Sequence, residues 1–479
     1  MTEFSISPTQ NALRGTIRVP ADKSITHRAL MLTPLVHGES QIENYLDSET
    51  TRATLNCLRA MGADIQEIDA HTLRVNGRGL HSLQEPRDVL DCLGSGTTMR
   101  LLSGICAGQH FLSVLDGTPA LKRRPMGRII EPLKQMGATI LARDNDRFAP
   151  LVLRGGNLRG IEYAQPVASA QVKSAILFAG LFADTPTTIH EPAPSRDHSE
   201  RMLRALGVDV SSFTLFGPSR LTEHSIRITP PASLRLPTSN FQLPNDFSSA
   251  AFFVVAALLV KNSQLVLENV GLNPGRTGLL DALTRMGAEF VIENQREENG
   301  EPLGDLVVST ADLRATHVSG AEIPRMIDEF PIFALAATQA HGETCVRDAQ
   351  ELRVKESDRV ASVAQELRKL GAQIEEHEDG FTILGPTRLH GARVNAHNDH
   401  RLAMSLAIAA LIAEGETIVE GWESVADSFP NFPSLMLQVA GPKSQEPSHR
   451  ACPELVEGAQ GASNLGSATC NLQPATWNL

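Results

Sequence analysis

Apolar and polar positions along the chain follow one pattern that occurs five times. In each copy an apolar stretch with helical spacing ends in Leu or Met, and Gly, a small residue, a polar residue and an apolar residue follow. The glycines lie 70 to 84 residues apart, at Gly62, Gly137, Gly207, Gly287 and Gly371. A glycine in the left-handed conformation ends a helix and can lead directly into a strand. The spacing therefore predicts a repeated unit of helix and strand.

A degraded sixth copy stands at Val439-Ala440-Gly441, where no strand pattern follows the glycine, so the final repeat is expected to be weaker. Short apolar runs at 265–269, 306–309 and 417–420 are the expected strands of these units. A chain of 479 residues is too long for one ordinary core. Six units therefore predict two domains of three units each.

Two segments interrupt the repeats. The polar, Pro-containing segment 234–243 is the expected crossover between the two halves, and the tail after residue 440, which has no periodicity, is expected to be disordered and non-catalytic. The longest apolar run, 250–260, is 11 residues long. Because a membrane span needs about 20 apolar residues, this run predicts a buried helix.

Composition narrows the possible functions. The net charge of −12 and the 4% aromatic content argue against general nucleic-acid binding. The six cysteines are scattered without zinc-like spacing, which predicts reduced thiols and no metal site. Residues 1–10 carry no secretory signal pattern, so a cytoplasmic protein is expected. An anionic ligand would have to be attracted by a local field.

Four segments combine a capping residue with a cation at the predicted start of a helix. A cation there opposes the helix dipole at a cost of up to about 1 kcal/mol, and a solvated surface Arg explains any single case. Four cases together favour a site where backbone amides and cations bind an anion. The segments are Asp22 before Lys23-Ser24-Ile25-Thr26-His27-Arg28, Ser195 before Arg196, Ser357 before Asp358-Arg359, and Asn398-Asp399 before His400-Arg401.

Four other segments carry weaker signals. Segment 93–102 is a glycine loop that opens a helix, and 122–128 places four cations around a Pro before a helix expected over 129–135. Segment 169–174 precedes an apolar helix expected over 175–182. Asp328 and Glu329 stand in an apolar stretch, where an unpaired carboxylate would have a raised pKa suited to proton abstraction. An ordinary turn, a solvated basic loop and a surface acid pair remain the alternatives.

Taken together, the motifs between about residues 13 and 440 resemble the 3-phosphoshikimate 1-carboxyvinyltransferases, or EPSP synthases, of the subgroup called class II. The motifs occur in the order typical of the family. They are Asp22-Lys23-Ser24-Ile25-Thr26-His27-Arg28, Arg124-Pro125-Met126-Gly127-Arg128, Ser169-Ala170-Gln171-Val172-Lys173, Arg196-Asp197-His198-Ser199-Glu200, Met326-Ile327-Asp328-Glu329, Arg353-Val354-Lys355-Glu356-Ser357-Asp358-Arg359 and Asp399-His400-Arg401.

The resemblance implies an α/β (α+β) fold, an inside-out α/β barrel in which each of two similar domains contains three βαβαββ repeats. The active site would lie in the interdomain cleft. One domain would span 21–234, the other would combine 1–20 with 235–440, and 441–479 would be the disordered tail. The family also implies a monomer that acts on two small molecules, without nucleic acid, membrane, metal or cofactor.

The resemblance further implies enolpyruvyl transfer from phosphoenolpyruvate to the 5-hydroxyl of shikimate 3-phosphate. Asp328 would be the base on the hydroxyl, and Glu356 with Lys23 would move the proton at C3. The shikimate 3-phosphate site would comprise Lys23, Ser24, Arg28, Ser169, Ala170, Gln171, Arg196, Asp328 and Lys355. The phosphoenolpyruvate site would comprise Lys23, Gly96, Arg124, Gln171, Arg359 and Arg401.

Two departures from the family pattern stand out. Ala21 replaces a usual Gly, and Leu93-Gly94 replaces a usual Gly-Asn, so the Asn amide is missing beside phosphoenolpyruvate. Gly96 occupies the position where an added methyl accompanies glyphosate resistance in the family, so this loop alone is expected to give no tolerance. The rival readings are a UDP-N-acetylglucosamine enolpyruvyl transferase, whose mobile loop usually carries a Cys that 122–128 lacks, and a catalytically inactive anion-binding homologue.

Overall fold

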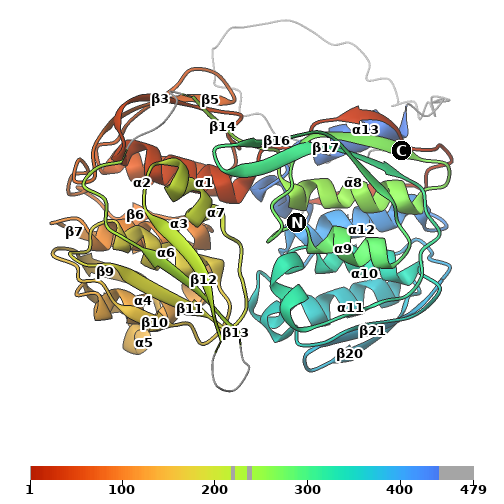
Figure 1. Ribbon diagram of the computed structural model, residues 1–479. Coiled ribbons are helices and arrows are strands. Elements are labelled where there is room, and N and C mark those ends of the chain that lie inside the picture. The colour runs from red at the N-terminus through yellow and green to blue at the C-terminus, as the bar shows by residue number, and fades with distance from the viewer. Residues whose placement is uncertain (1, 217–221, 235–239, 442–479) are drawn as a thin grey trace, which may run out of the picture.

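The computed structural model describes residues 2–216, 222–234 and 240–441, which form two halves lying side by side (Figure 1). One hydrophobic core contains buried residues from Ile25 to Leu243, and the other contains buried residues from 4–19 and 247–440. Half of the expected crossover, 235–239, and the tail from 442 onward lie outside the described residues.

Five of the six sheets contain four strands in the same arrangement. The first two strands pair in parallel, the third pairs antiparallel with the second, and the fourth pairs antiparallel with the third. The strand orders are β14-β3-β5-β4, β6-β7-β9-β8, β10-β11-β13-β12, β2-β15-β17-β16 and β18-β19-β21-β20, and the sixth sheet has the order β22-β23-β1. The predicted α/β fold with three repeated units in each half is confirmed, and the described residues supply three of the four strands of the sixth unit.

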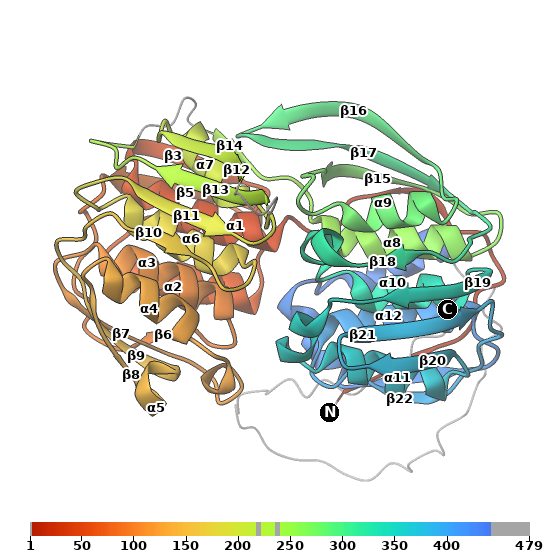
Figure 2. The same cartoon turned by 60° about the horizontal axis from the view of Figure 1, so that its bottom comes forward.

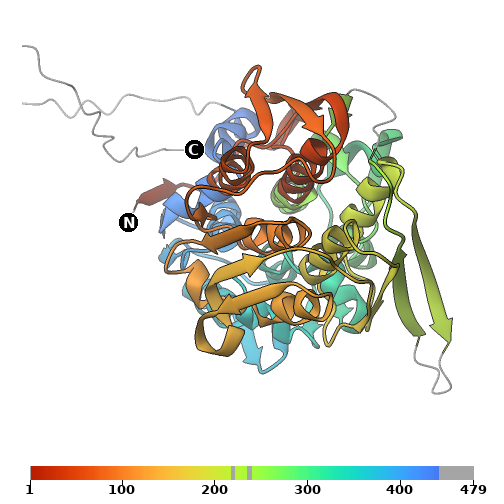
Figure 3. The same ribbon diagram turned by 90° about the vertical axis from the view of Figure 1, so that its left-hand side faces the viewer.

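The first half contains the first three units. Its first unit comprises α1 (Lys23–Leu32), η1 (Thr33–Leu35), β3 (His37–Glu43), α2 (Glu49–Ala60), β4 (Asp64–Glu67), β5 (Thr72–Arg78) and β14 (Asn240–Gln242). The second comprises β6 (Leu90–Asp91), α3 (Gly96–Ala107), β7 (Leu112–Asp116), η2 (Leu121–Arg123), α4 (Gly127–Gln135), β8 (Thr139–Ala142), α5 (Arg143–Asp146) and β9 (Phe148–Arg154). The third comprises β10 (Glu162–Ala164), α6 (Ala170–Gly180), β11 (Thr187–Glu191), α7 (His198–Ala205), β12 (Val210–Phe216) and β13 (Thr222–Ile228). The β12–β13 hairpin projects from this half (Figure 3).

The second half contains the other three units. The fourth comprises β2 (Arg14–Ile17), α8 (Phe247–Leu259), β15 (Gln264–Gly271), α9 (Gly278–Arg285), β16 (Phe290–Glu298) and β17 (Glu301–Ser309). The fifth comprises β18 (His317–Val318), η3 (Gly320–Met326), α10 (Phe330–Thr338), β19 (Gly342–Val346), η4 (Gln350–Val354), α11 (Arg359–Lys369), β20 (Gln373–His377) and β21 (Gly380–Gly385). The sixth comprises β22 (Arg393–Asn395), α12 (His400–Ile412), β23 (Thr417–Glu420), η5 (Trp422–Asp427), α13 (Phe432–Ala440) and β1 (Glu3–Ile6).

The repeat glycines take the conformation that the sequence predicts. All five have φ between +79° and +112°, and each lies between the end of a helix and a strand. Gly441 also has a positive φ, of 73°, at the end of α13. The N-terminal strand β1 supplies the third strand of the sixth sheet, and the position that corresponds to β20 comes after Gly441, outside the described residues.

The helices divide into two kinds. The second helices of the units, such as α4 and α9, have one buried face, whereas α8, α10 and α12 are almost wholly buried at the centre of the second half. The predicted buried helix at 250–260 is confirmed as part of α8. In the described parts of the chain, no helix is long and apolar enough to cross a membrane.

Two chain segments connect the halves and run beside each other. The amide of Asp22 donates to the Pro244 carbonyl at 2.9 Å, and the amide of Asp246 donates to the Pro20 carbonyl at 2.8 Å. The two segments also exchange strands, because β14 pairs with β3 in the first half and β2 pairs with β15 in the second. This connection places the N-termini of α1 and α8 next to the boundary between the halves.

Candidate active site

A cavity of about 450 Å³ lies between the halves. Its walls come from the starts of α1, α6 and α12, from the segments before α4 and α7, and from the region between η3 and α11. Eleven of the predicted site residues line it, namely Lys23, Ser24, Arg124, Ser169, Ala170, Gln171 and Arg196 from the first half, and Asp328, Lys355, Glu356 and Arg401 from the second. The remaining three, Arg28, Gly96 and Arg359, lie behind this lining.

Two of the predicted helix starts have the expected cap and first-turn cation. The Asp22 side chain accepts from the Ile25 amide at 2.8 Å, and Asp399 accepts from the Arg401 amide at 3.0 Å. The first residues of these helices, Lys23 and His400, line the cavity. Free backbone amides and cationic side chains therefore face the same space, which is the arrangement that binds anions.

At the two other predicted helix starts, the predicted capping residue was wrong. Ser195 does not cap a helix, because its hydroxyl donates to the buried Glu191 carboxylate, and α7 begins only at His198. The cap of α11 is Asp358, which accepts from the Ala361 amide at 3.0 Å, in place of the predicted Ser357. Arg196 therefore lies in the segment before α7, where its side chain can reach the other half.

Two predicted helices begin earlier than expected. The helix expected over 129–135 starts at Gly127, directly after the Pro125-Met126 turn, and the helix expected over 175–182 is α6, which starts at Ala170. Ser169 caps α6 by accepting from the Val172 amide at 3.4 Å. Gln171 is therefore in the first turn of a helix that points at the cavity.

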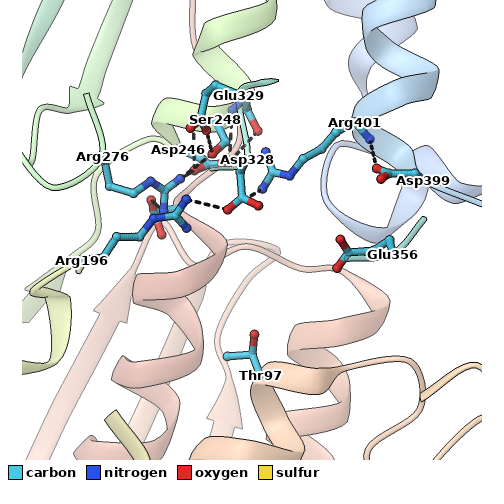
Figure 4. A network of polar contacts seen from close by, with 12 residues as sticks. Thr97, Arg196, Asp246, Ser248, Arg276, Asp328, Glu329, Glu356, Asp399 and Arg401 are labelled. Atoms are coloured by element: carbon cyan, nitrogen blue, oxygen red, sulfur yellow. Dashed lines mark hydrogen bonds and ion pairs between the residues drawn. The ribbon is translucent and has the colours of Figure 1, made fainter. Parts of the chain in front are cut away.

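Asp328 lies at the centre of the charged groups that face the cavity (Figure 4). Its carboxylate is 2.6 Å from Arg196, 3.1 Å from Arg359 and 3.7 Å from Arg401. Although burial opposes ionisation, Arg401, Arg196 and Arg359 hold the pKa of Asp328 well below its usual value. The predicted raised pKa applied only to an unpaired carboxylate, and Asp328 is paired.

The adjacent Glu329 is in a different environment. Its side chain accepts a hydrogen bond from the Ser248 hydroxyl, away from the cavity, and burial raises its pKa. Arg276 lies close by, where it bonds Asp246 at 2.7 Å. Asp328, and not Glu329, is therefore the carboxylate that faces the ligand space.

Glu356 is the second carboxylate of the cavity. It lies 2.8 Å from Arg359 and 3.4 Å from Arg124, which hold its pKa well below the usual value although burial opposes this. Arg359 is only 1% exposed and also bonds Asp399 at 2.7 Å. One guanidinium group thus links both candidate proton-moving carboxylates to the cap of α12.

Several buried donors and ring nitrogens at the cavity have no hydrogen-bond partner among the described residues. They are the Nε atoms of Arg124 and Arg196 and both ring nitrogens of His400. Burial lowers the pKa of His400 well below its usual value, and Lys23 and Arg401 add to this effect. Burial also lowers the pKa values of Lys23 and Lys355. Because buried polar groups are normally hydrogen-bonded, these groups indicate a site for a polar ligand.

The loop at Gly96 does not line the cavity at Gly96 itself, but it packs against Arg124, which does. A Cβ atom at Gly96 would lie 3.2 Å from Arg124 Nη1 and 3.0 Å from Arg100 Nη1. Arg100 donates to Gln171 Oε1 at 2.5 Å and to the Pro125 carbonyl at 3.2 Å. Arg100 was not among the predicted site residues. Its position four residues after Gly96, on the same face of the helix, could have identified it as a neighbour of this loop.

The departure at Leu93-Gly94 lies beside this loop. Leu93 has φ +48°, and its amide donates to the Asp91 side chain at 2.8 Å. Neither Leu93 nor Gly94 lines the cavity, whereas Thr97 does and accepts a hydrogen bond from Gln171 at 3.0 Å. Thr97 is a second polar residue of the site that was not among the predicted site residues.

Arg28 is 3% exposed, and its side chain connects the start of α1 to α6 and α7. Its guanidinium group donates to the Ser24 carbonyl and to the Ser174 and Ser199 hydroxyls at 2.7 to 2.8 Å. Nearby, Lys173 is fully buried and lies 2.9 Å from Glu191 and 2.7 Å from Glu200. The Ser-Ala-Gln-Val-Lys and Arg-x-His-x-Glu motifs are therefore joined by a buried ion cluster.

Among the described residues, no group of three or more His, Cys, Asp or Glu side chains is placed to hold a metal ion. The cysteines of this part of the chain, Cys57, Cys92, Cys106 and Cys345, are free thiols. Cys452 and Cys470 lie outside the described residues.

Comparison with known proteins agrees with this geometry. Residues 8–436 match the family model described as EPSP synthase (3-phosphoshikimate 1-carboxyvinyltransferase). A 3-phosphoshikimate 1-carboxyvinyltransferase of Desulforudis audaxviator is 50% identical over 433 residues, which cover 90% of this chain and 97% of the relative. The protein of the same name from Gloeobacter violaceus is 51% identical over 434 residues, which cover 90% of this chain and 97% of that protein.

Solved structures show the same relationship. An EPSP synthase structure from Acinetobacter baumannii superposes with a TM-score of 0.81 at 40% identity, covering 92% of this chain and 98% of that one. The enolpyruvyl transferase NikO from Streptomyces tendae shares the fold, with a TM-score of 0.72 at 19% identity over 91% of this chain and 97% of its own. The chain belongs to the EPSP synthase (3-phosphoshikimate 1-carboxyvinyltransferase) family.

Proposed function

We infer that this protein transfers the enolpyruvyl group of phosphoenolpyruvate to the 5-hydroxyl of shikimate 3-phosphate, releasing phosphate. The observation that carries this proposal is the position of Asp328, an ionised carboxylate held by three arginines at a cavity with unpartnered donors. Both substrates carry a phosphate and a carboxylate, so they match the cations of this cavity. The relatives that cover most of the chain carry the corresponding name.

The two substrates are assigned to different parts of the cavity. Shikimate 3-phosphate would be held by Lys23, Ser24, Arg28, Ser169, Ala170, Gln171, Arg196, Asp328 and Lys355, which lie around the starts of α1, α6, α7 and α10 and in the segment before α11. Phosphoenolpyruvate would contact Lys23, Gly96, Arg124, Gln171, Arg359 and Arg401. Planar guanidinium groups suit both assignments, because they bind carboxylate and phosphate oxygens through two bonds at once.

Substrate binding would prepare Asp328 to act as a base. In the structure, Arg196, Arg359 and Arg401 neutralise its charge. Substrate phosphate and carboxylate oxygens compete for these guanidinium groups. Once the guanidinium groups bind the substrates, they stabilise the Asp328 carboxylate less, so its pKa rises toward the range in which it can accept a proton.

The reaction is an addition followed by an elimination. The 5-hydroxyl oxygen bonds to C2 of phosphoenolpyruvate while Asp328 takes the hydroxyl proton and C3 gains a proton from the Glu356–Lys23 pair. The bond from C2 to the phosphate oxygen then breaks, phosphate leaves with the proton that Asp328 had accepted, and C3 returns its proton to the same pair. Arg124 and Arg401 would stabilise the negative charge on the departing phosphate and on the carboxylate.

The decisive experiment measures phosphate release on mixing the protein with both substrates, compared with each substrate alone. Release only in the presence of both supports the proposal. No release would favour the inactive anion-binding homologue. Release with UDP-N-acetylglucosamine in place of shikimate 3-phosphate would favour the other enolpyruvyl transferase, which no specific feature of the cavity supports.

Replacing Asp328 tests the assignment of the base. Asp328→Asn keeps the shape of the side chain but removes its charge and its ability to accept a proton. We expect kcat to fall by about 10² to 10⁴-fold. A steady-state assay at saturating concentrations of both substrates measures this change, and near-normal turnover in a folded variant would refute the role.

We also propose the division of the chain and its setting in the cell. One domain comprises 21–234 and includes β14, which pairs with β3, the other combines 1–20 with the rest of 235–440, and the reaction occurs between them. The protein acts as a monomer in the cytoplasm, and the free thiols at Cys57, Cys92, Cys106 and Cys345 support the second part of this proposal, the reducing compartment.

A further inference from the structure

Five consecutive residues at the start of α7 divide their contacts between the two halves. The first three bond to the second half, Arg196 to Asp328, Asp197 to Asn273 and His198 to Glu301. The next two bond within the first half, Ser199 to Arg28 and Glu200 to Lys173. The start of α7 is therefore held on both sides of the boundary.

The contact between His198 and Glu301 is the most buried of the bonds that cross the boundary here. The two side chains are 2% and 4% exposed, and His198 Nδ1 lies 2.7 Å from Glu301 Oε1. Because it faces a carboxylate, Nδ1 is the ring nitrogen assigned a hydrogen. The other oxygen, Oε2, accepts from Asn273 Nδ2 at 2.9 Å. Both oxygens are thus satisfied, and loss of either partner would leave a buried polar group unpaired.

Glu301 occupies a rigid position in the second half. It is the first residue of β17, directly after the turn that joins β16 to β17, and this hairpin reaches toward the first half (Figure 2). The turn residues Asn299 and Gly300 have φ of +53° and +83°. The Gly300 carbonyl accepts from Arg201 of α7 at 2.9 Å. The hairpin tip is therefore fixed against the first turns of α7.

We propose that His198 and Glu301 are positioning residues for the shikimate 3-phosphate site. They hold the start of α7 against the second half, so that Arg196, two residues before His198, stays opposite Asp328. This inference rests on the proposed function, in which Arg196 and Asp328 both contact shikimate 3-phosphate. A displacement of about 1 Å in such a contact is enough to reduce catalysis by a large factor.

Three variants test the proposal: His198→Leu and Glu301→Gln break the pair, whereas His198→Asn keeps an N–H donor near the position of Nδ1. Steady-state kinetics should be measured well below the unfolding temperature of each variant. We expect His198→Leu and Glu301→Gln to raise KM for shikimate 3-phosphate about tenfold and KM for phosphoenolpyruvate by less than about twofold. His198→Asn should restore KM for shikimate 3-phosphate to within about threefold of wild type.

A second His–Glu pair, which does not cross the boundary, provides a control. His190 Nε2 lies 2.9 Å from Glu162 within the first half, neither side chain lines the cavity, and the control variant is His190→Leu. Its KM values should equal those of wild type. The proposal is overturned if folded Glu301→Gln keeps a normal KM for shikimate 3-phosphate, if both KM values rise equally, or if the pair-breaking variants cannot fold. An inactive wild-type protein would instead overturn the proposed function.

Discussion

The pKa values of the adjacent carboxyl groups of Asp328 and Glu329 are shifted in opposite directions by their surroundings. Burial raises the pKa of Glu329, which bonds Ser248, whereas Arg401, Arg196 and Arg359 lower the pKa of Asp328. The two residues are adjacent in sequence, so the different partners that their side chains meet account for the opposite directions of the two pKa shifts. Pairs of carboxyl groups with separated pKa values are a common feature of active sites.

The pairing of Asp328 predicts a pH-dependent contribution to stability. A carboxyl group whose pKa is lowered on folding stabilises the folded protein fully above its unfolded pKa, near 3.9, and this contribution is lost as pH falls through the folded pKa. Without substrates, Asp328→Asn should therefore lower the free energy of unfolding by about 2 kcal/mol at pH 7.

Urea denaturation of wild type and Asp328→Asn at pH 7 and pH 3 measures this contribution. The difference between the two proteins should be smaller at pH 3, since the unfolded wild-type carboxyl is then mostly protonated. An equal difference at both pH values, or a more stable variant at pH 7, would contradict the charge pairing described for Asp328.

The close packing around Gly96 predicts that an added methyl group weakens phosphoenolpyruvate binding. The methyl of Gly96→Ala would lie 3.2 Å from Arg124 Nη1, so the guanidinium group has to move by a few tenths of an ångström. We expect KM for phosphoenolpyruvate to rise by about threefold to thirtyfold with little change in KM for shikimate 3-phosphate. Inhibition by glyphosate should weaken in parallel, while wild type is inhibited. A variant with unchanged KM values and inhibition would show that Arg124 does not depend on this space.

At the scale of helices and strands, the sequence predicts periodic features better than termini. The five left-handed glycines, the buried helix α8 and the caps Asp22 and Asp399 were all predictable, because each depends on local spacing. Ser195 was misread because its hydroxyl bonds Glu191, a choice made by tertiary structure. Local sequence does not show which acceptor a hydroxyl will find.

The ion cluster that joins α6, β11 and α7 predicts a large stability effect. Lys173→Met removes the ammonium group that contacts both Glu191 and Glu200, and it leaves both carboxylates buried. We expect the free energy of unfolding to fall by about 3 to 5 kcal/mol. The matched control is Lys134→Met, which breaks the partly exposed pair with Asp146 and should cost less than about 1 kcal/mol. Equal urea midpoints for the two variants would disprove a structural role for the cluster.

At the scale of the whole molecule, the six units were predictable from the repeat, but the contacts between the halves were not. Arg196 and Asp328 are 132 positions apart, and Arg128 and Glu351 are 223 positions apart. No periodic pattern connects residues at such separations, and the family resemblance alone brought Arg196 and Asp328 to one site. The family resemblance therefore predicted which side chains belong to the proposed site, whereas the structure supplied their pairing.

These pairs predict how the protein responds to salt. Arg128 forms two bonds with Glu351, at 2.9 and 3.1 Å, and Arg124 lies 3.4 Å from Glu356, so charge pairs hold the halves together across the cavity. The side chains of both pairs are partly exposed. Raising the salt concentration from about 0.05 M to about 1 M shortens the screening length from over 10 Å to about 3 Å. The unliganded protein should therefore open, and its radius of gyration in X-ray scattering should increase.

Glu351→Gln should lower the salt concentration at which the halves separate, whereas bound substrate should raise it. The variant lacks one attraction across the boundary, so it should reach the larger radius at lower salt than wild type does. Shikimate 3-phosphate would bridge cations of both halves, and at saturation it should keep the radius small over the whole range. A radius that is independent of salt in both proteins would mean that apolar packing, and not these charge pairs, sets the separation of the halves.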